Sequence, residues 1–256
     1  MTTIVHTTAL TDADRIPFEH GVALAGRAGA RLLSIHADDD ESDGALPDPS
    51  SLLARWHWPA DRLRHRAIVH RGCDDPVETL LGALDRDGLS RLFITSWAET
   101  IVHHSNAPVL VLPHRSRGFI TASGQVLVKR IVIPAYDQAG AATGIEHARW
   151  FAELADIDRL ELHLVHLGDR SQDSYLRFPR GWTVVQRALD EDPERLGEQY
   201  EGPGTLLVVS EDGRDQTLGE RVFGTLATKI LRNARCPVLM APRHGVPPSR
   251  RSERGA

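Results

Sequence analysis

The sequence repeats itself once, over about half of its length. The segment NAPVLVLP at residues 106–113 returns as RCPVLMAP at residues 235–242, an offset of 129 positions. His36 and His166, each near the end of a strand-like segment, lie 130 positions apart. A repeat of this length is too long for a solenoid and indicates a duplicated domain. Each copy can therefore be compared with the other for what it has kept and lost.

Length and composition fit two globular domains. The chain has 256 residues, 41% hydrophobic and 25% charged, so each half can bury a core of its own. We expect domains at 1–113 and 129–242, a linker at 114–128 and a mobile polar tail at 243–256. The net charge of −5 gives no reason to expect nucleic acid or an anionic membrane as partner.

Apolar strand-like segments alternate with helical patterns in both halves. Strands are expected at 3–8, 31–37, 66–70, 91–96 and 109–112, and again at 129–134, 160–167, 182–186, 205–210 and 237–240. The longest helices are expected at 12–28, 139–155 and 218–233. Such alternation predicts parallel sheets with right-handed crossovers, in which ligands bind beyond the carboxyl ends of the strands at the switch point.

One junction in the second half carries features of a phosphate site. After the apolar strand 206–209 come Ser210 and Gly213, and then Gly224 and Thr225 at a helix start. Small residues at a strand end let backbone amides approach a phosphate, and a helix start adds aligned amides. Two glycines at such a junction can also do no more than shape the loop and the helix entry, so both interpretations stay open.

The strand, the loop, the Gly-Thr pair, the helix and the closing NARCPVL segment together resemble the end of a universal stress protein domain. The resemblance covers both halves, at about 3–113 and 129–242, so the chain resembles a tandem universal stress protein. It implies two doubly wound α/β domains, each with a five-stranded parallel sheet of order 3-2-1-4-5. Because family members pair through their fifth strands, it also implies a pseudo-dimer within one chain, and a further dimerisation of the chain stays open.

Nucleotide-binding members of this family carry an Asp after the first strand and a loop of pattern Gly-x2-Gly-x9-Gly-Ser/Thr. Here Tyr136 stands at the Asp position with Asp137 one place later, the first Gly is Ser210, and the second spacing is one residue too long. The resemblance still implies ATP or AMP in the second half, with Asp137 on the ribose or base. The residues expected at that site are Pro134, Ala135, Tyr136, Asp137, Leu167, Ser210, Gly213, Gly224, Thr225 and Leu226.

The first half departs further from the family pattern. Ala98 follows Ser96 by two positions, whereas the matching Ala227 follows Ser210 by seventeen. About fifteen residues of loop are therefore missing, and an absent backbone cannot hold a phosphate. We expect no nucleotide in the first half.

Other groupings point to no catalytic residues and no metal. His163 and His166 lie three apart on one expected strand, so they face opposite sides and cannot chelate together. His36 and His166 either hold the scaffold by hydrogen bonds or line a pocket. Cys73 and Cys236 lack CxxC spacing, which favours reduced structural thiols. No nucleophile elbow, Walker loop or dinucleotide motif occurs.

These patterns favour a cytoplasmic stress-response protein that binds and regulates rather than catalyses, with an unknown protein partner. No signal-like leader or membrane-length apolar run stands in the sequence. Two alternatives are a nucleotide hydrolase on a related α/β fold and a ligand-free interaction scaffold.

Overall fold

The fold is taken from a computed structural model of the chain. It describes residues 2–8, 10–38, 48–71, 75, 78–79, 90–95, 105, 107–135, 137–167, 176–189, 195–210 and 225–242. No helix in this part of the chain is both long and apolar enough to cross a membrane.

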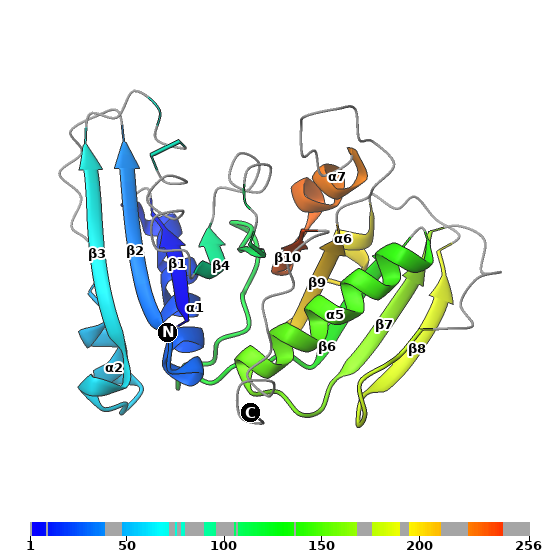
Figure 1. The fold of residues 1–256 in the computed structure, drawn as a ribbon, viewed down its shortest axis with the longest axis horizontal. Helices are drawn as coiled ribbons and strands as arrows, with labels where there is room; N and C mark the ends of the chain where they lie inside the picture. Colours follow the sequence, from blue (N-terminus) through cyan, green and yellow to red (C-terminus); the bar gives the residue numbers. More distant parts are fainter. Residues whose placement is uncertain are drawn as a thin grey trace, which may run out of the picture.

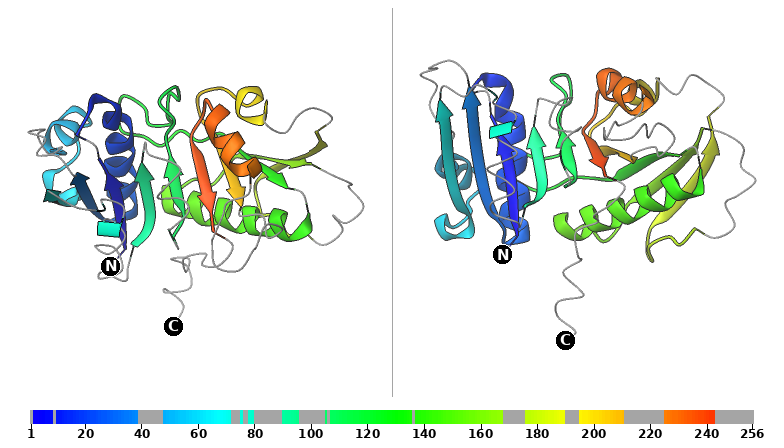
Figure 2. Two further views of the ribbon diagram at one scale, coloured as in Figure 1. Left: turned by 90° about the horizontal axis from the view of Figure 1, so that it is seen from above. Right: turned by 45° about the horizontal axis from the view of Figure 1, so that its top comes forward.

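Ten strands form one sheet of order β3-β2-β1-β4-β5-β10-β9-β6-β7-β8, which Figures 1 and 2 show from three sides. The first five are β1 (Thr3–Thr7), β2 (Arg31–Asp38), β3 (Arg64–Arg71), β4 (Ser90–Thr95) and β5 (Val109–Val111). The second five are β6 (Arg130–Ala135), β7 (Glu161–His166), β8 (Thr183–Ala188), β9 (Thr205–Ser210) and β10 (Val238–Ala241). Each half has the expected order 3-2-1-4-5.

The two halves meet at their fifth strands. β5 and β10 pair antiparallel, with Leu110 opposite Leu239, whereas every other pair in the sheet is parallel. The sheet is therefore larger than the two separate five-stranded sheets expected from the sequence. An unpaired strand edge exposes backbone amides and carbonyls, and pairing β5 with β10 satisfies both edges at once.

Helices cover both faces of the sheet. On one face lie α1 (Arg15–Ala28), α2 (Ser50–Arg55) and α5 (Gln138–Ala155), and on the other lie α6 (Leu196–Gln199) and α7 (Thr225–Asn233). Alternate strand residues enter the two cores: Ile4 packs toward α1, whereas its neighbour Val5 belongs to the opposite cluster. Because both faces are covered, the central strands are largely apolar, although β1 also buries Thr3, His6 and Thr7.

The segment between the halves is packed against them. The ring of Phe119 contacts those of His20 of α1 and Phe151 of α5, with centroid distances of 4.6 Å and 5.8 Å. The backbone amide of Phe119 donates to His20 Nε2 at 2.9 Å. Arg27 of α1 adds a hydrogen bond of 3.1 Å to the carbonyl of Ala155, at the end of α5. α1, α5 and Phe119 thus fix one half against the other.

Cys236 is expected to resist thiol reagents in the folded protein. Its side chain is 1% exposed, and burial raises the pKa of the thiol to about 12, so the reactive thiolate is scarce. In a Cys73→Ser variant, which leaves Cys236 as the sole cysteine, a colorimetric disulfide reagent should label no thiol until denaturant is added. Rapid labelling of that variant without denaturant would show that Cys236 is accessible.

Candidate functional site

The candidate site lies at the carboxyl ends of β6 and β9. These strands are neighbours and run parallel, but the helices that follow them, α5 and α7, cover opposite faces of the sheet. Adjacent parallel strands whose connections leave on opposite faces form a switch point, where the diverging chain leaves room for a ligand. The residues just past these strand ends are those that the sequence pointed to.

Asp137 and Ser210 converge on Gly140 in the first turn of α5. The Asp137 carboxylate Oδ1 accepts a hydrogen bond from the Gly140 amide at 2.8 Å, and Ser210 Oγ donates to the Gly140 carbonyl at 3.1 Å. Asp137 is therefore the N-cap of α5. A Cβ at position 140 would lie 3.3 Å from Asp137 Oδ1 and 3.5 Å from Ser210 Oγ, so a side chain there would crowd the contact.

The position of Asp137, one place later than in the family pattern, matches its role as the N-cap of α5. A residue directly after β6 would be too early to cap α5, whereas Asp137, one place later, has the extended backbone of an N-cap with φ −144° and ψ 174°. One carboxylate oxygen is committed to the helix. The side chain is exposed, so Oδ2 faces solvent and can accept from a ligand hydroxyl.

Three other expected site residues lie at the carboxyl ends of β6 and its neighbour β7. Pro134 and Ala135 are buried as the last residues of β6, and the amide of Leu167 donates to the carbonyl of Ala135 at 2.9 Å. Thr225 and Leu226 begin α7. Tyr136, Gly213 and Gly224 fall outside the described residues, as does the shortened first-half connection after Thr95. The structure thus brings together Pro134, Ala135, Asp137, Leu167 and Ser210.

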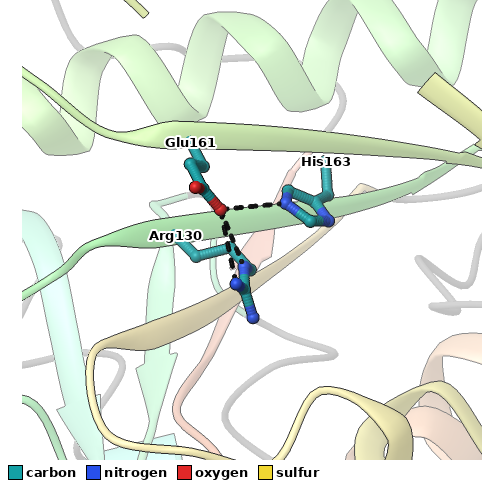
Figure 3. Close-up of polar contacts among 3 residues, drawn as sticks. All are labelled: Arg130, Glu161 and His163. Atoms are coloured by element: carbon teal, nitrogen blue, oxygen red, sulfur yellow. Dashed lines mark hydrogen bonds and ion pairs between the residues drawn. The ribbon is translucent and has the colours of Figure 1, made fainter. Parts of the chain in front are cut away.

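A second polar cluster lies on the sheet face that α6 covers, as Figure 3 shows. Glu161 Oε2 accepts from Arg130 Nε at 3.4 Å and Nη2 at 3.3 Å, and it lies 3.2 Å from His163 Nε2. Burial lowers the pKa of His163, while the bonds from His163 and Arg130 lower that of Glu161. A neutral His163 with Nε2–H on Glu161 leaves Nδ1 without a donor, near the ring of Tyr200. No sequence pattern pointed to this cluster.

His36 is buried and its Nδ1 lies 2.8 Å from the carbonyl of Thr8, which favours the scaffold interpretation for that residue. Within the described part of the chain, no three His, Cys, Asp or Glu side chains gather closely enough to hold a metal ion.

No model of a known protein family matches the chain, and no curated protein matches its sequence. Its structure, however, resembles that of a universal stress protein from Archaeoglobus fulgidus DSM 4304, with a TM-score of 0.58 at 13% identity, covering 94% of this chain and 98% of that one. A functionally unknown protein from Pseudomonas aeruginosa PAO1 gives a TM-score of 0.59 at 12% identity, covering 94% and 92%.

The chain has the universal stress protein fold. The likeness extends over 94% of the chain, so it includes both halves and their join. At such low identity the likeness establishes the arrangement of elements alone.

Proposed function

We propose that the protein is a ligand-binding, regulatory protein of the universal stress type that holds an adenine nucleotide, ATP or AMP, in its second half. The observation that carries this proposal is the meeting of Asp137 and Ser210 on Gly140, at the switch point between β6 and β9. Ser210, the last residue of β9, is joined there by a direct hydrogen bond to Gly140 of α5, the helix that follows β6, across a sequence separation of 70 residues.

The chemistry of this edge suits a nucleotide divided between two strand ends. The exposed Asp137 carboxylate is an acceptor for ribose hydroxyls, and the end of β7 offers the half-buried, apolar Leu167 to a base. Residues 211–224, which resemble a phosphate-binding loop in sequence, directly follow Ser210. Phosphates would thus lie on the β9 side and the nucleoside on the β6 side.

Placing a negative charge at Ser210 should weaken nucleotide binding. In Ser210→Asp, the new carboxylate would repel phosphates at the start of the loop, and we expect the Kd for ATP to rise at least tenfold, or about 1.4 kcal/mol. Ser210→Ala loses the bond to Gly140 but adds no charge, so it should weaken ATP binding less. Isothermal titration calorimetry with ATP and AMP measures both effects.

The matched control is Ser123→Asp, which makes the same change at an exposed turn between the halves. It should bind ATP as the unmodified protein does, and circular dichroism confirms that each variant is folded. Absence of ATP and AMP binding by the unmodified protein, or equal affinities in the two Asp variants, would overturn the proposal. Steady ATP turnover by the unmodified protein, lost in Ser210→Asp, would instead favour the nucleotide hydrolase.

A further inference from the structure

A cavity of about 470 Å³ opens in the first half, at the carboxyl end of β1. Its wall comes from β1, from the connection to α1, from α1 itself, and from α2 with the residues before it; the described residues of β4 do not contribute. It therefore lies on the α1 side of the sheet rather than at the switch point between β1 and β4. Its volume is within the range of small-molecule sites.

His6 lies against this cavity with unmet hydrogen-bonding capacity. The residue is 0% exposed, and neither Nδ1 nor Nε2 makes a hydrogen bond of standard geometry, although the backbone of Asp14 is close enough to the ring to raise its pKa in part. Buried polar groups in proteins are normally paired. His20, equally buried on the same face, shows the usual arrangement, because its Nδ1–H donates to the Ile16 carbonyl at 2.8 Å and its Nε2 accepts from Phe119. His6 thus combines unmet hydrogen-bonding capacity with a position in the cavity wall.

The loop that forms the cavity rim is held in a strained shape. Leu10, which lines the cavity, has φ of 59°, a backbone conformation that non-glycine residues seldom adopt. Thr8 Oγ1 accepts from the Leu10 amide at 2.9 Å and donates to Asp14 Oδ2 at 3.1 Å. The Thr11 amide also donates to Asp14 Oδ2, at 3.1 Å. Such strain persists where surrounding contacts impose it, and it tends to occur at ligand sites.

The charges around the cavity determine whether it favours a cationic or an anionic ligand. The lining residues carry four carboxylates and two guanidinium groups, a formal charge of −2 with neutral histidine. Glu19 is paired with Arg55 at 2.8 Å and with Arg15 at 3.5 Å. The pKa of Asp48 is held below its usual value by hydrogen bonds from Ser50, so this exposed rim carboxylate is ionised at neutral pH. An anionic ligand would be repelled, and a cation favoured.

The interior offers both an acceptor and an apolar wall. Burial lowers the pKa of His6 to about 4, with the charge of Asp14 opposing this in part, so the ring is neutral at pH 7 and one nitrogen is a bare acceptor. Phe18, whose ring centroid lies 5.4 Å from that of His6, and Leu52 supply apolar surface beside it. A ligand with an N–H donor next to an apolar group would match both the acceptor nitrogen of His6 and the apolar surface of Phe18 and Leu52.

We propose that this cavity binds a small organic primary amine, whose ammonium group donates to His6 and faces the carboxylates while its apolar part packs on Phe18 and Leu52. The site lies in the other half from the proposed nucleotide site and takes the opposite charge. The proposal therefore does not rest on nucleotide binding, and either can fail without the other.

Three probes of similar shape and different charge test the proposal: benzylamine, benzyl alcohol and benzoate. With ¹³C-labelled histidine, NMR follows the Cε1–Hε1 signal of His6, identified as the signal that a His6→Leu variant lacks. At pH 7, benzylamine should shift this signal saturably, benzyl alcohol should bind about tenfold more weakly, and benzoate should not bind. Equal or tighter binding of benzyl alcohol or benzoate, or no shift with benzylamine, would overturn the proposal.

Two tryptophan substitutions on α2 locate the binding. Ser51 is exposed and lines the cavity, whereas Ala54 is exposed and does not, so Ser51→Trp should abolish the benzylamine shift and Ala54→Trp should leave it unchanged. Benzylamine binding that survives in folded Ser51→Trp would place the site elsewhere. Asp12→Asn, an exposed rim change, should weaken benzylamine and leave benzyl alcohol unaffected; equal effects on both probes would contradict the charge argument.

Discussion

Gly118→Ala is expected to lower the free energy of unfolding by about 3 kcal/mol, summing backbone strain, overpacking and a weakened hydrogen bond. Gly118 has φ of 67°, and a Cβ there would lie 2.3 Å from His20 Cε1 and 2.7 Å from Nε2. His20 is buried and cannot swing aside without losing its bonds to Ile16 and Phe119. Because Phe119 also contacts Phe151, the damage should reach the packing between the halves. Urea denaturation followed by circular dichroism measures the loss.

Gly181→Ala is the control that separates backbone strain from the steric overlap of an added Cβ. Gly181 has φ of 85°, but a Cβ there would meet its nearest atom, the carbonyl oxygen of Asp158, at an ordinary 3.8 Å. We expect this variant to lose only about 1 kcal/mol, from the backbone alone. Equal losses at the two glycines would mean that His20 yields freely, and that the Phe119 contact does not fix the halves as described.

Acid should destabilise the protein strongly between pH 6.5 and about 4. Burial is the main cause that lowers the pKa of both His6 and His20 from 6.5 to about 4. The unfolded chain therefore takes up protons first as the pH falls, so stability is fully present above pH 6.5 and declines until the folded-state pKa is reached. Each histidine contributes about 1.4 kcal/mol per pH unit in that window. Urea midpoints measured across it give the slope.

His6→Leu should reduce that slope by about one proton and raise stability at its acid end. Thr7→Val is the matched control, because it removes another buried, unpartnered polar group of β1 but no titratable one, and it should leave the slope unchanged. An unchanged slope in His6→Leu would mean that His6 accepts a proton in the folded state as readily as in the unfolded one.

The fold was predictable because its signals are local or repeated. Apolar strand segments, the stop of α1 at Gly29 and the recurrence of the closing segment required no knowledge of tertiary contacts. The first turn after β1 was less predictable. A helix was expected from about residue 12, but Asp12–Asp14 form a 3-10 turn and α1 begins at Arg15. The Asp14 carboxylate accepts hydrogen bonds from Thr8 and Thr11, which precede the helix. Whether these bonds form depends on where β1 ends, so the start of α1 could not be predicted from the local sequence alone.

The candidate site was predictable in position but not in detail. Asp137 and Ser210 followed from strand ends and a family pattern, whereas Gly140, the residue that joins them, has no motif of its own. The cavity beside His6 could not be predicted from the sequence. The surroundings of the His6 side chain are set by where α1 and α2 pack, and this is a tertiary arrangement that no local pattern reveals. The pattern Thr11-x-x-Asp14 was the one available signal near it.

The pairing of β5 with β10 has a consequence for how the two halves can change. Because one chain carries both, their association is unimolecular: dilution does not separate them, and neither half must recognise a free copy of itself. A self-associating single domain places every mutation on both sides of its interface at once, whereas a fused pair does not. Each half is thereby free to diverge in what it binds while the other supplies its neighbouring strand.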